Sequence, residues 1–220
     1  MDIHGQTGVY KWAFGPSNTN RTSILNHLIT KYNLKSYLEI GVRDGSNFNK
    51  INVNELVGVD PNLIPYKNVN KKNALLVNKT SDEYFKDLDR KFDIIFIDGL
   101  HLEEQTTKDM INSMNHLNEN GLLVMHDCNP PSKFHQRDNY CVNGRYPSWN
   151  GTVWKSYAKT RMKNPDLKMY VVNTDWGVGI IQKGTQELYP TIEDLNYEIL
   201  EKDRKTLLNL ISVEEFLQLF

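Results

Sequence analysis

The sequence predicts an α/β fold: a doubly wound sheet of about seven strands with helices on both faces and a terminal antiparallel hairpin. Two observations predict it. Short apolar runs of strand length alternate with amphipathic stretches of helix length through residues 22–125. Several of these runs end in an acidic residue, a pattern expected where parallel strands deliver functional groups to one edge of a sheet. A length of 220 residues suits one domain, so we expect residues 1–220 to form a single unit.

The first half of the chain carries the alternation. A helix is expected over Thr22–Tyr32, within an N-terminal helical segment that covers residues 1–33. A core covering residues 34–185 follows. Its expected elements as far as residue 125 are strand Ser36–Ile40, short helix Ser46–Ile51, strands Leu56–Val59 and Leu75–Val77, helix Asp82–Leu88 with Ser81 as N-cap, strand Phe92–Ile97, helix Leu102–Leu117 stopped by Gly121, and strand Leu122–Met125.

The second half begins with a long loop over residues 128–150, which contains three prolines and several aromatic residues. A loop of this length without structure of its own is usually functional or disordered, and its aromatic content favours a functional lid. A helix Gly151–Met162 follows, and then strands Lys168–Val172 and Val178–Gln182, joined as a hairpin through Asn173–Gly177. Residues 190–220 are expected to form helices with a break near Ser212, packed against the body or against a second subunit.

Composition excludes several classes of function. Lys and Arg total 26 against 27 Asp and Glu, so nothing indicates nucleic acid or an anionic membrane as a partner. Two cysteines, Cys128 and Cys141, are too few for a disulfide framework and favour a reducing, cytoplasmic location. The chain contains no apolar run long enough for a membrane span, and its polar N-terminus lacks a signal peptide's apolar core.

The turn after the first expected strand indicates a nucleoside site. Gly41 ends that strand and Gly45 follows in the turn, which lets the backbone approach a ligand closely. Asp60 ends the next strand nineteen residues later, the usual offset for an acid that binds the two hydroxyls of a ribose. Arg43 occupies the position of the middle glycine in a dinucleotide turn, where its bulk would obstruct a pyrophosphate. S-adenosylmethionine (SAM) has no phosphate, so it is favoured over a nicotinamide dinucleotide.

Two later strands each end in an acid that has a histidine close to it. Asp98 is followed three residues later by His101, and Asp127 is preceded directly by His126. Because neighbouring parallel strands end at one crevice, these four side chains should converge. Two carboxylates and two imidazoles suit a divalent metal with a general base beside it. We expect Asp98, His126 and Asp127 as metal ligands and His101 as the base.

Five segments carry a family resemblance by their order and spacing: YLEIGVRDGSNF, VGVDP, KTSDEYF, FDIIFIDGLHLEEQ and NGLLVMHDCNPP. They resemble the class I SAM-dependent methyltransferases, which have a Rossmann-like fold, and look most like the small bacterial group named methyltransferase domain 24. WNGTVWK and NTDWGVGII extend the resemblance over residues 34–185. It implies Glu39 and Gly41 beside the methionine part of SAM, Asp60 on the ribose and Ser81 near the adenine. Apart from this resemblance, Asp98 could bind the SAM ammonium instead of a metal.

The D-x-x-H pattern of Asp98 and His101 also resembles metal-dependent O-methyltransferases that act on sugars of macrolide antibiotics. Those enzymes have Glu-Asp at the next strand end, whereas this chain has His126 and Asp127. A nitrogen ligand would shift the preferred metal from magnesium toward manganese or iron.

The leading hypothesis is therefore a SAM-dependent, metal-assisted O-methyltransferase. Its acceptor is expected to be a small polyhydroxylated molecule, such as a nucleotide-activated sugar or a surface-glycan precursor, which Asn129, Trp149 and Trp176 could contact. A nicotinamide-dependent sugar oxidoreductase is a second interpretation, although Arg43 and the absence of a Tyr-x-x-x-Lys pair count against it. A non-catalytic SAM-binding module is a third, but it would have no reason to keep Asp98, His101 and Asp127 together.

Overall fold

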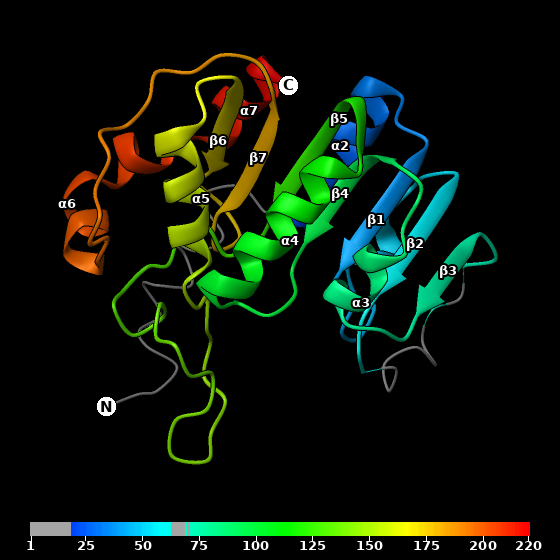
Figure 1. Cartoon of the computed structure of the whole chain (residues 1–220), viewed down its shortest axis with the longest axis horizontal. Coiled ribbons are helices and arrows are strands. Elements are labelled where there is room, and N and C mark those ends of the chain that lie inside the picture. Colours follow the sequence, from blue (N-terminus) through cyan, green and yellow to red (C-terminus); the bar gives the residue numbers. More distant parts are fainter. Residues whose placement is uncertain (1–18, 63–68, 70) are drawn as a thin grey trace.

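The computed structural model describes residues 19–62, 69 and 71–220. Its centre is one mixed sheet of eight strands in the order β3-β2-β1-β4-β5-β7-β6-β8 (Figure 1). The predicted doubly wound α/β sheet is thereby confirmed, with one strand more than expected. The strands are β1 Ser36–Ile40, β2 Glu55–Val59, β3 Ala74–Val77, β4 Phe92–Ile97, β5 Leu117–Met125, β6 Leu167–Val172, β7 Val178–Lys183 and β8 Leu210–Ile211.

Strand direction divides the sheet into two parts. β3, β2, β1, β4 and β5 are parallel to one another, so their carboxyl ends share one edge. β7 runs antiparallel to both β5 and β6, and β8 pairs parallel to β6. The predicted terminal hairpin is thus confirmed, and its turn over residues 173–177 comes to the same edge as the parallel strand ends.

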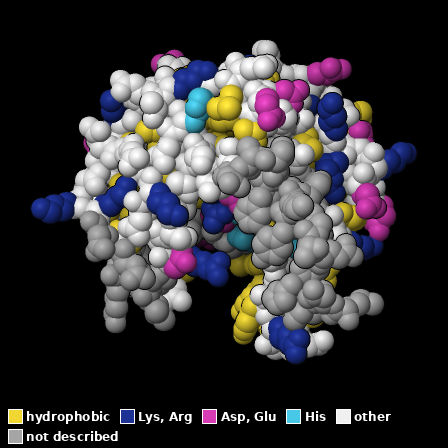
Figure 2. Space-filling view, turned by 180° about the vertical axis from the view of Figure 1, so that it is seen from behind, with side chains coloured by type: hydrophobic (Ala, Val, Ile, Leu, Met, Phe, Trp, Pro, Cys, Tyr) yellow, Lys and Arg dark blue, Asp and Glu magenta, His cyan; other side chains and the backbone are white. Residues whose placement is uncertain are grey.

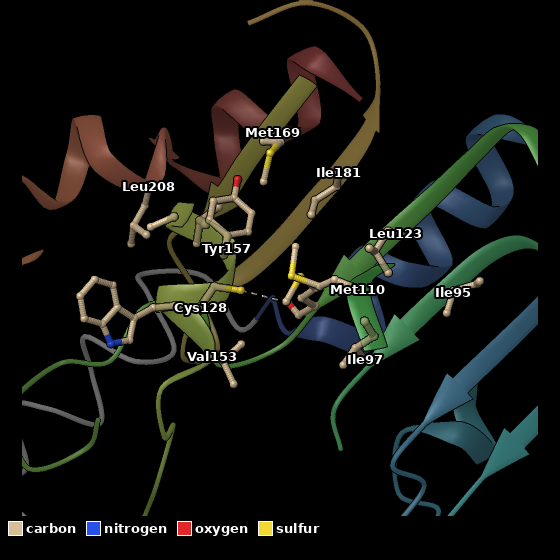
Figure 3. Packing of buried hydrophobic residues seen from close by; sticks show 14 of the residues in the cluster. Ile95, Ile97, Met110, Leu123, Cys128, Val153, Tyr157, Met169, Ile181 and Leu208 are labelled. Carbon is tan, nitrogen blue, oxygen red and sulfur yellow. Dashed lines mark hydrogen bonds between the residues drawn. The ribbon is translucent and has the colours of Figure 1, made fainter. Parts of the chain in front are cut away.

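Helices cover both faces of the sheet, as the sequence predicts. Buried side chains of α3, α4, α5 and α6 form one core with the sheet, and those of α2 and α7 form a second core on the opposite face. Figure 3 shows the first core, in which Met110, Tyr157 and Leu208 come from α4, α5 and α6. The helices are α2 Arg21–Tyr32, α3 Ser81–Lys86, α4 Glu103–Asn115, α5 Val153–Lys163, α6 Tyr197–Leu208 and α7 Val213–Leu219.

The boundary between α4 and β5 differs from the prediction. The helix ends at Asn115, and β5 begins at Leu117, so Gly121 lies inside the strand and does not stop the helix. His116 ends the helix because its Nδ1 lies 2.7 Å from the carbonyl oxygen of Asn112 and its Nε2 lies 3.1 Å from that of Leu88. The imidazole thus contacts one carbonyl of the last turn of α4 and one carbonyl after α3, an end signal that differs from the expected glycine.

Three smaller differences concern helix ends. Ser81 is the first residue of α3, and Thr80 is its N-cap, in a capping box with Glu83. The expected short helix Ser46–Ile51 is reduced to a single 3₁₀ turn, Phe48–Lys50. The predicted break near Ser212 is confirmed because Ser212 caps α7, but the short strand β8 before it was not predicted. In the predicted N-terminal helical segment, helix α2 is confirmed, whereas residues 1–18 lie outside the described residues.

Over the part of the chain that the structure describes, no helix combines the length and the apolar character needed to cross a bilayer.

Gly41 fixes the contact between the ends of β1 and β4. Its φ is +90°, and a Cβ atom at this position would lie 2.2 Å from the carbonyl oxygen of Asp98. Only glycine therefore fits here, for reasons of both backbone conformation and space. The predicted glycine of the ligand turn thus also sets how closely Asp98 approaches the end of β1.

Gly41→Ala should destabilise the fold by more than about 2 kcal/mol, because left-handed strain adds to a backbone collision. Gly144→Ala is a matched control. Gly144 also has a positive φ, of +72°, but a Cβ atom added there would meet no atom of the described residues within 4 Å. Urea unfolding of both variants measures the difference. Equal losses of stability would contradict the proposed close approach.

Candidate active site

A cavity of about 740 Å³ opens where the carboxyl ends of β1, β2, β4 and β5 meet the turn between β6 and β7. That volume is in the range of a cofactor-sized site. Histidine, acidic and basic side chains are visible close together near the centre of the face shown in Figure 2. The cavity is lined by most of the residues that the sequence singles out: Glu39, Gly41, Asp60, Ser81, Asp98, His101, His126, Asp127, Trp149 and Trp176.

Asp60 lies at the end of β2 with both carboxylate oxygens held by the backbone. Oδ2 accepts a hydrogen bond of 2.8 Å from the amide of Arg43, and Oδ1 accepts one of 2.8 Å from the amide of Asn62. These bonds orient the carboxylate toward the cavity it lines. Arg43 adopts a φ of 52°, so the backbone keeps a conformation that favours glycine although the side chain is an arginine.

Glu39 is buried at the end of β1, in a hydrogen-bonded group with Tyr37 and Asn47. Its Oε2 accepts bonds of 2.5 Å from the Tyr37 hydroxyl and 2.9 Å from Asn47 Nδ2. Burial raises the pKa of Glu39 to about 8, against the opposing effect of the Tyr37 hydrogen bond, and the charge of Asp98 adds to the rise. Glu39 is therefore mostly protonated near neutral pH in the absence of a ligand.

Ser81 lies at another end of the cavity, in a group of polar side chains. Gln105 Nε2 lies 3.2 Å from Ser81 Oγ, 3.0 Å from Asp82 Oδ1 and 3.1 Å from Asp109 Oδ1. Burial raises the pKa of Asp109. The sequence prediction included Ser81 but missed Gln105 and Asp109, because their positions within helix α4 resemble those of ordinary amphipathic residues.

The four residues predicted to converge do meet. His101 Nε2 is 3.4 Å from Asp98 Oδ1, and His101 Nδ1 is 3.3 Å from Asp127 Oδ2. His126 Nδ1 lies 3.3 Å from Asp98 Oδ1 and 3.0 Å from Asp127 Oδ2. Each imidazole thus contacts both acids. His101 precedes α4, which begins at Glu103.

Opposite charges dominate the electrostatics of this cluster. Burial alone would lower the pKa values of His101 and His126, but the charges of Asp127 and Asp98 outweigh it and raise both, that of His126 strongly. Burial alone would raise the pKa of Asp98, yet His126, His101 and Arg21 hold it well below its usual range. Asp98 and the two imidazoles therefore stabilise one another's charged forms.

Two further members of the cluster were not predicted. Arg21 Nη1 lies 3.2 Å from His126 Nε2 and 3.1 Å from Asp175 Oδ2, and Arg21 Nε lies 3.6 Å from Asp98 Oδ2. Asp175 is buried in the β6–β7 turn. Burial opposes its ionisation, but the hydrogen bond to His126 and the charges of His126 and Arg21 lower its pKa to about 2. In the sequence, Asp175 looks like an ordinary turn residue and Arg21 like the start of a surface helix.

The cluster fits a divalent cation by its donor set and by its charge. Ligand atoms of Asp98, His101 and Asp127 all lie within 4.8 Å of one another. When ionised, the three aspartates carry three negative charges, and Arg21 supplies one positive charge. The remaining two can be balanced by two imidazolium protons or by one divalent cation. Oxygen and nitrogen donors of this kind suit magnesium, manganese or iron.

The three residues expected to contact the acceptor have different environments. Trp149 stacks on His101 with 5.0 Å between the ring centroids and an interplanar angle of 22°. Trp176 also lines the cavity. Asn129 is not among the described residues that line it: its side chain is buried, accepts a hydrogen bond from Arg204 and donates one of 3.1 Å to Asn173. Asn129 ties the start of the loop to the β6–β7 turn.

Residues 128–150 form neither a helix nor a long strand, as predicted, but the loop is internally organised. The guanidinium of Arg137 lies inside it and stacks over Phe134 at 4.3 Å. Trp149 Nε1 donates to the carbonyl oxygen of Arg137 at 2.5 Å, and Asn150 Nδ2 donates to Asp127 Oδ1 at 2.7 Å. Arg137 itself donates to the carbonyl oxygens of Phe134, Tyr140, Pro147 and Ser148.

Comparison with known proteins agrees with this geometry. Residues 38–128 match the model of a family described as a methyltransferase domain. A methyltransferase from Podospora anserina, bound to S-adenosylhomocysteine (SAH), aligns with a TM-score of 0.59 at 17% identity, over 83% of this chain and 88% of its own. An O-methyltransferase from Bacillus cereus in complex with SAH gives 0.56 at 12% identity, over 84% and 87%. A spermidine synthase from Thermotoga maritima gives 0.52 at 18% identity, over 87% and 72%.

No curated protein matches the chain. The structural likeness establishes the Rossmann-like methyltransferase fold, and the sequence prediction of a SAM-dependent methyltransferase agrees with both comparisons that found matches. Because a spermidine synthase shares the fold, the fold alone does not specify which group is transferred.

Glu39→Gln should stabilise the ligand-free protein in a pH-dependent way. The folded-state pKa of Glu39, about 8, exceeds its ordinary value of 4.5, so the folded protein binds the extra proton between these limits. This group's contribution to stability therefore falls as pH rises through that window. The melting temperature of the variant should match wild type near about pH 5 and exceed it by at least about 2–4 °C above pH 8. A constant difference at all pH values would contradict the buried, protonated Glu39.

Proposed function

We propose that this protein is a SAM-dependent, divalent-metal-assisted O-methyltransferase acting on a hydroxyl of a small polyhydroxylated acceptor. The observation that carries the proposal is the convergence of Asp98, His101, His126 and Asp127 at one end of a cofactor-sized cavity. A nucleoside site next to paired acids and imidazoles can hold a methyl donor and activate an oxygen nucleophile beside it.

The cofactor part of the proposal rests on the order of side chains along the sheet edge. Asp60 on β2 would accept hydrogen bonds from the ribose hydroxyls, and Ser81 with its neighbours would face the adenine. Glu39 and Asp98, at the ends of β1 and β4, would face the ammonium of the methionine part. Arg43 in the turn supports SAM over a nicotinamide dinucleotide, since a pyrophosphate would need the space of its side chain.

The reaction itself is an in-line displacement in which an acceptor oxygen attacks the methyl carbon and the sulfonium leaves as a thioether. An alcohol proton must be removed at the same time. His101 is proposed as the base, because 19% of its side chain is exposed on the cavity side, whereas 6% of the His126 side chain is exposed. The Trp149 ring stacked on His101 holds the imidazole in orientation.

A divalent cation is proposed at Asp98 and Asp127, with His126 as the nitrogen donor. When bound, such a cation would orient acceptor hydroxyls and lower their pKa. The Nε2 atom of His126 lies 3.5 Å from Asp175 Oδ1, which resembles the carboxylate–histidine arrangement of many metal ligands. His101 is the alternative nitrogen donor, because its ring also lies within reach of both acids. It cannot act as ligand and base through the same nitrogen.

The acceptor is proposed to be sugar-like, either a nucleotide-activated sugar or a glycan precursor. Trp149 and Trp176 line the cavity and could pack on a sugar ring, and the loop 128–150 would cover it. A non-catalytic SAM-binding module is disfavoured, because it would gain nothing from holding Asp98 and Asp127 at the cavity wall with the buried Asp175 beside them. That burial costs free energy unless the charges are used or compensated.

Metal binding should be measurable directly. Calorimetric titration of EDTA-treated protein with Mn²⁺ should show one site, and affinity should rise with pH because bound metal displaces protons from imidazoles whose pKa is raised. Asp127→Asn should abolish binding. Asp82→Asn, an acid at the adenine end of the same cavity, should not. Identical Mn²⁺ affinity in wild type and Asp127→Asn would remove the metal site.

His101→Gln should reduce kcat by about 10²–10⁴-fold, the usual contribution of a general base. Methyl transfer from labelled SAM to pooled nucleotide sugars provides the assay, and retained SAH and Mn²⁺ binding shows that the site is intact. His27→Gln is the control, since His27 is not among the described residues that line the cavity and its ring packs on Phe216 of α7. An unchanged kcat in His101→Gln would leave proton removal to another group.

A further inference from the structure

Arg21 is the residue whose position the proposed chemistry does not yet use. It is the first residue of α2, and its amide donates a bond of 2.8 Å to Asp175 Oδ2. Thr174 in the same turn also donates to the carbonyl oxygen of Thr19. The start of α2 is therefore docked onto the β6–β7 turn, and this docking carries the Arg21 side chain into the cavity.

The guanidinium is only partly occupied by protein partners. All its hydrogen bonds with described side chains use Nη1, which donates to both oxygens of Asp175 and lies 3.2 Å from His126 Nε2. Nε is buried and makes no hydrogen bond within the described residues. Of the side chain, 27% is exposed, and it lines the cavity. Asp175 thus fixes Nη1, whereas Nη2 makes none of these hydrogen bonds and remains for a ligand in the cavity that the side chain lines.

An arginine side chain is unusual in this cavity, because most of the charged residues that line it are acidic. Seven acidic residues are among the described residues that line it, but only two Lys or Arg side chains are, Arg21 and Arg43. Arg21 lies at the β4 and β5 end, with Nε 3.6 Å from Asp98 Oδ2, and its charge lowers the pKa of nearby Glu39. Arg43 lies on the turn after β1, where its amide holds Asp60.

We infer that Arg21 binds the carboxylate of the methionine part of SAM, an inference that rests on the proposed function. With the ribose on Asp60 at the end of β2, the methionine part points across β1 toward β4, where Arg21 lies. That part carries an ammonium and a carboxylate on one carbon. Glu39 and Asp98 suit the ammonium, and the guanidinium beside them suits the carboxylate. Arginine presents donors in a planar fork that matches a carboxylate.

This assignment gives Arg21 a role in ligand selection. A ligand with the same adenosine and ammonium but no carboxylate would leave the guanidinium without its partner and the acids unbalanced. The protein should therefore discriminate against decarboxylated forms of the cofactor. Asp175, which holds both the amide and Nη1 of Arg21, would be a positioning residue for this interaction.

The test is a thermodynamic cycle that measures the coupling between the Arg21 guanidinium and the ligand's carboxylate. Calorimetry measures the binding of SAH and of decarboxylated SAH to wild type, Arg21→Gln and the control Arg43→Gln, with thermal melts to confirm folding. Wild type and Arg43→Gln should prefer SAH by about 10- to 100-fold. Arg21→Gln should bind both ligands equally, by weakening SAH alone. Arg21→Lys should restore part of the preference, because it keeps the charge but not the fork.

Three results would overturn the inference. Equal binding of the two ligands by wild type would show that the carboxylate is not recognised. If Arg21→Gln bound both ligands more weakly by the same factor, Arg21 would support the structure of the site without contacting the carboxylate. Loss of the preference in Arg43→Gln but not in Arg21→Gln would assign the carboxylate to Arg43. If wild type bound neither ligand, the proposed cofactor itself would fail, which is a different outcome from the other three.

Discussion

The structure depends on compensating the buried negative charge of Asp98, Asp127 and Asp175. Carboxylates are costly to remove from water, so each must be paired. Arg21 and the imidazoles of His101 and His126 supply the pairing. Positive φ angles at Asp127, Asp175 and Trp176 add strain of about 1–3 kcal/mol each, which persists only where the surroundings enforce it. Strain and buried charge coincide at the cavity, which is typical of a functional site.

The features that the sequence predicts correctly are the strands, which follow from hydrophobic periodicity, and the acids that end them. β1 and β4 match the predicted ranges, and the acids after these and the neighbouring strands do reach one edge of the sheet. The reason is topological: parallel strands in a doubly wound sheet share an edge, so a residue that ends a strand is placed there without any knowledge of side-chain packing. Asp60, Asp98 and Asp127 were accessible to prediction for this reason.

Contacts between distant segments were not accessible in the same way. Arg21 and Asp175 are separated by 154 positions, and neither ends a parallel strand. Their pairing depends on how α2 docks on the β6–β7 turn, which no local pattern encodes. The error at Gly121 has a partly similar cause, since the His116 side chain at the end of α4 contacts Asn112 within the helix and also Leu88, which lies 28 positions away. Local sequence signals do not predict features that are set by contacts between distant segments.

The most direct test is a crystal structure of the protein grown with SAH and Mn²⁺. We expect an anomalous manganese peak bound by Asp98 and Asp127 with one imidazole, and SAH in the cavity with its ribose on Asp60. Manganese at this position next to SAH would connect the acidic cluster to cofactor chemistry. SAH outside the cavity, or no manganese between the two aspartates at saturating concentration, would contradict this expectation.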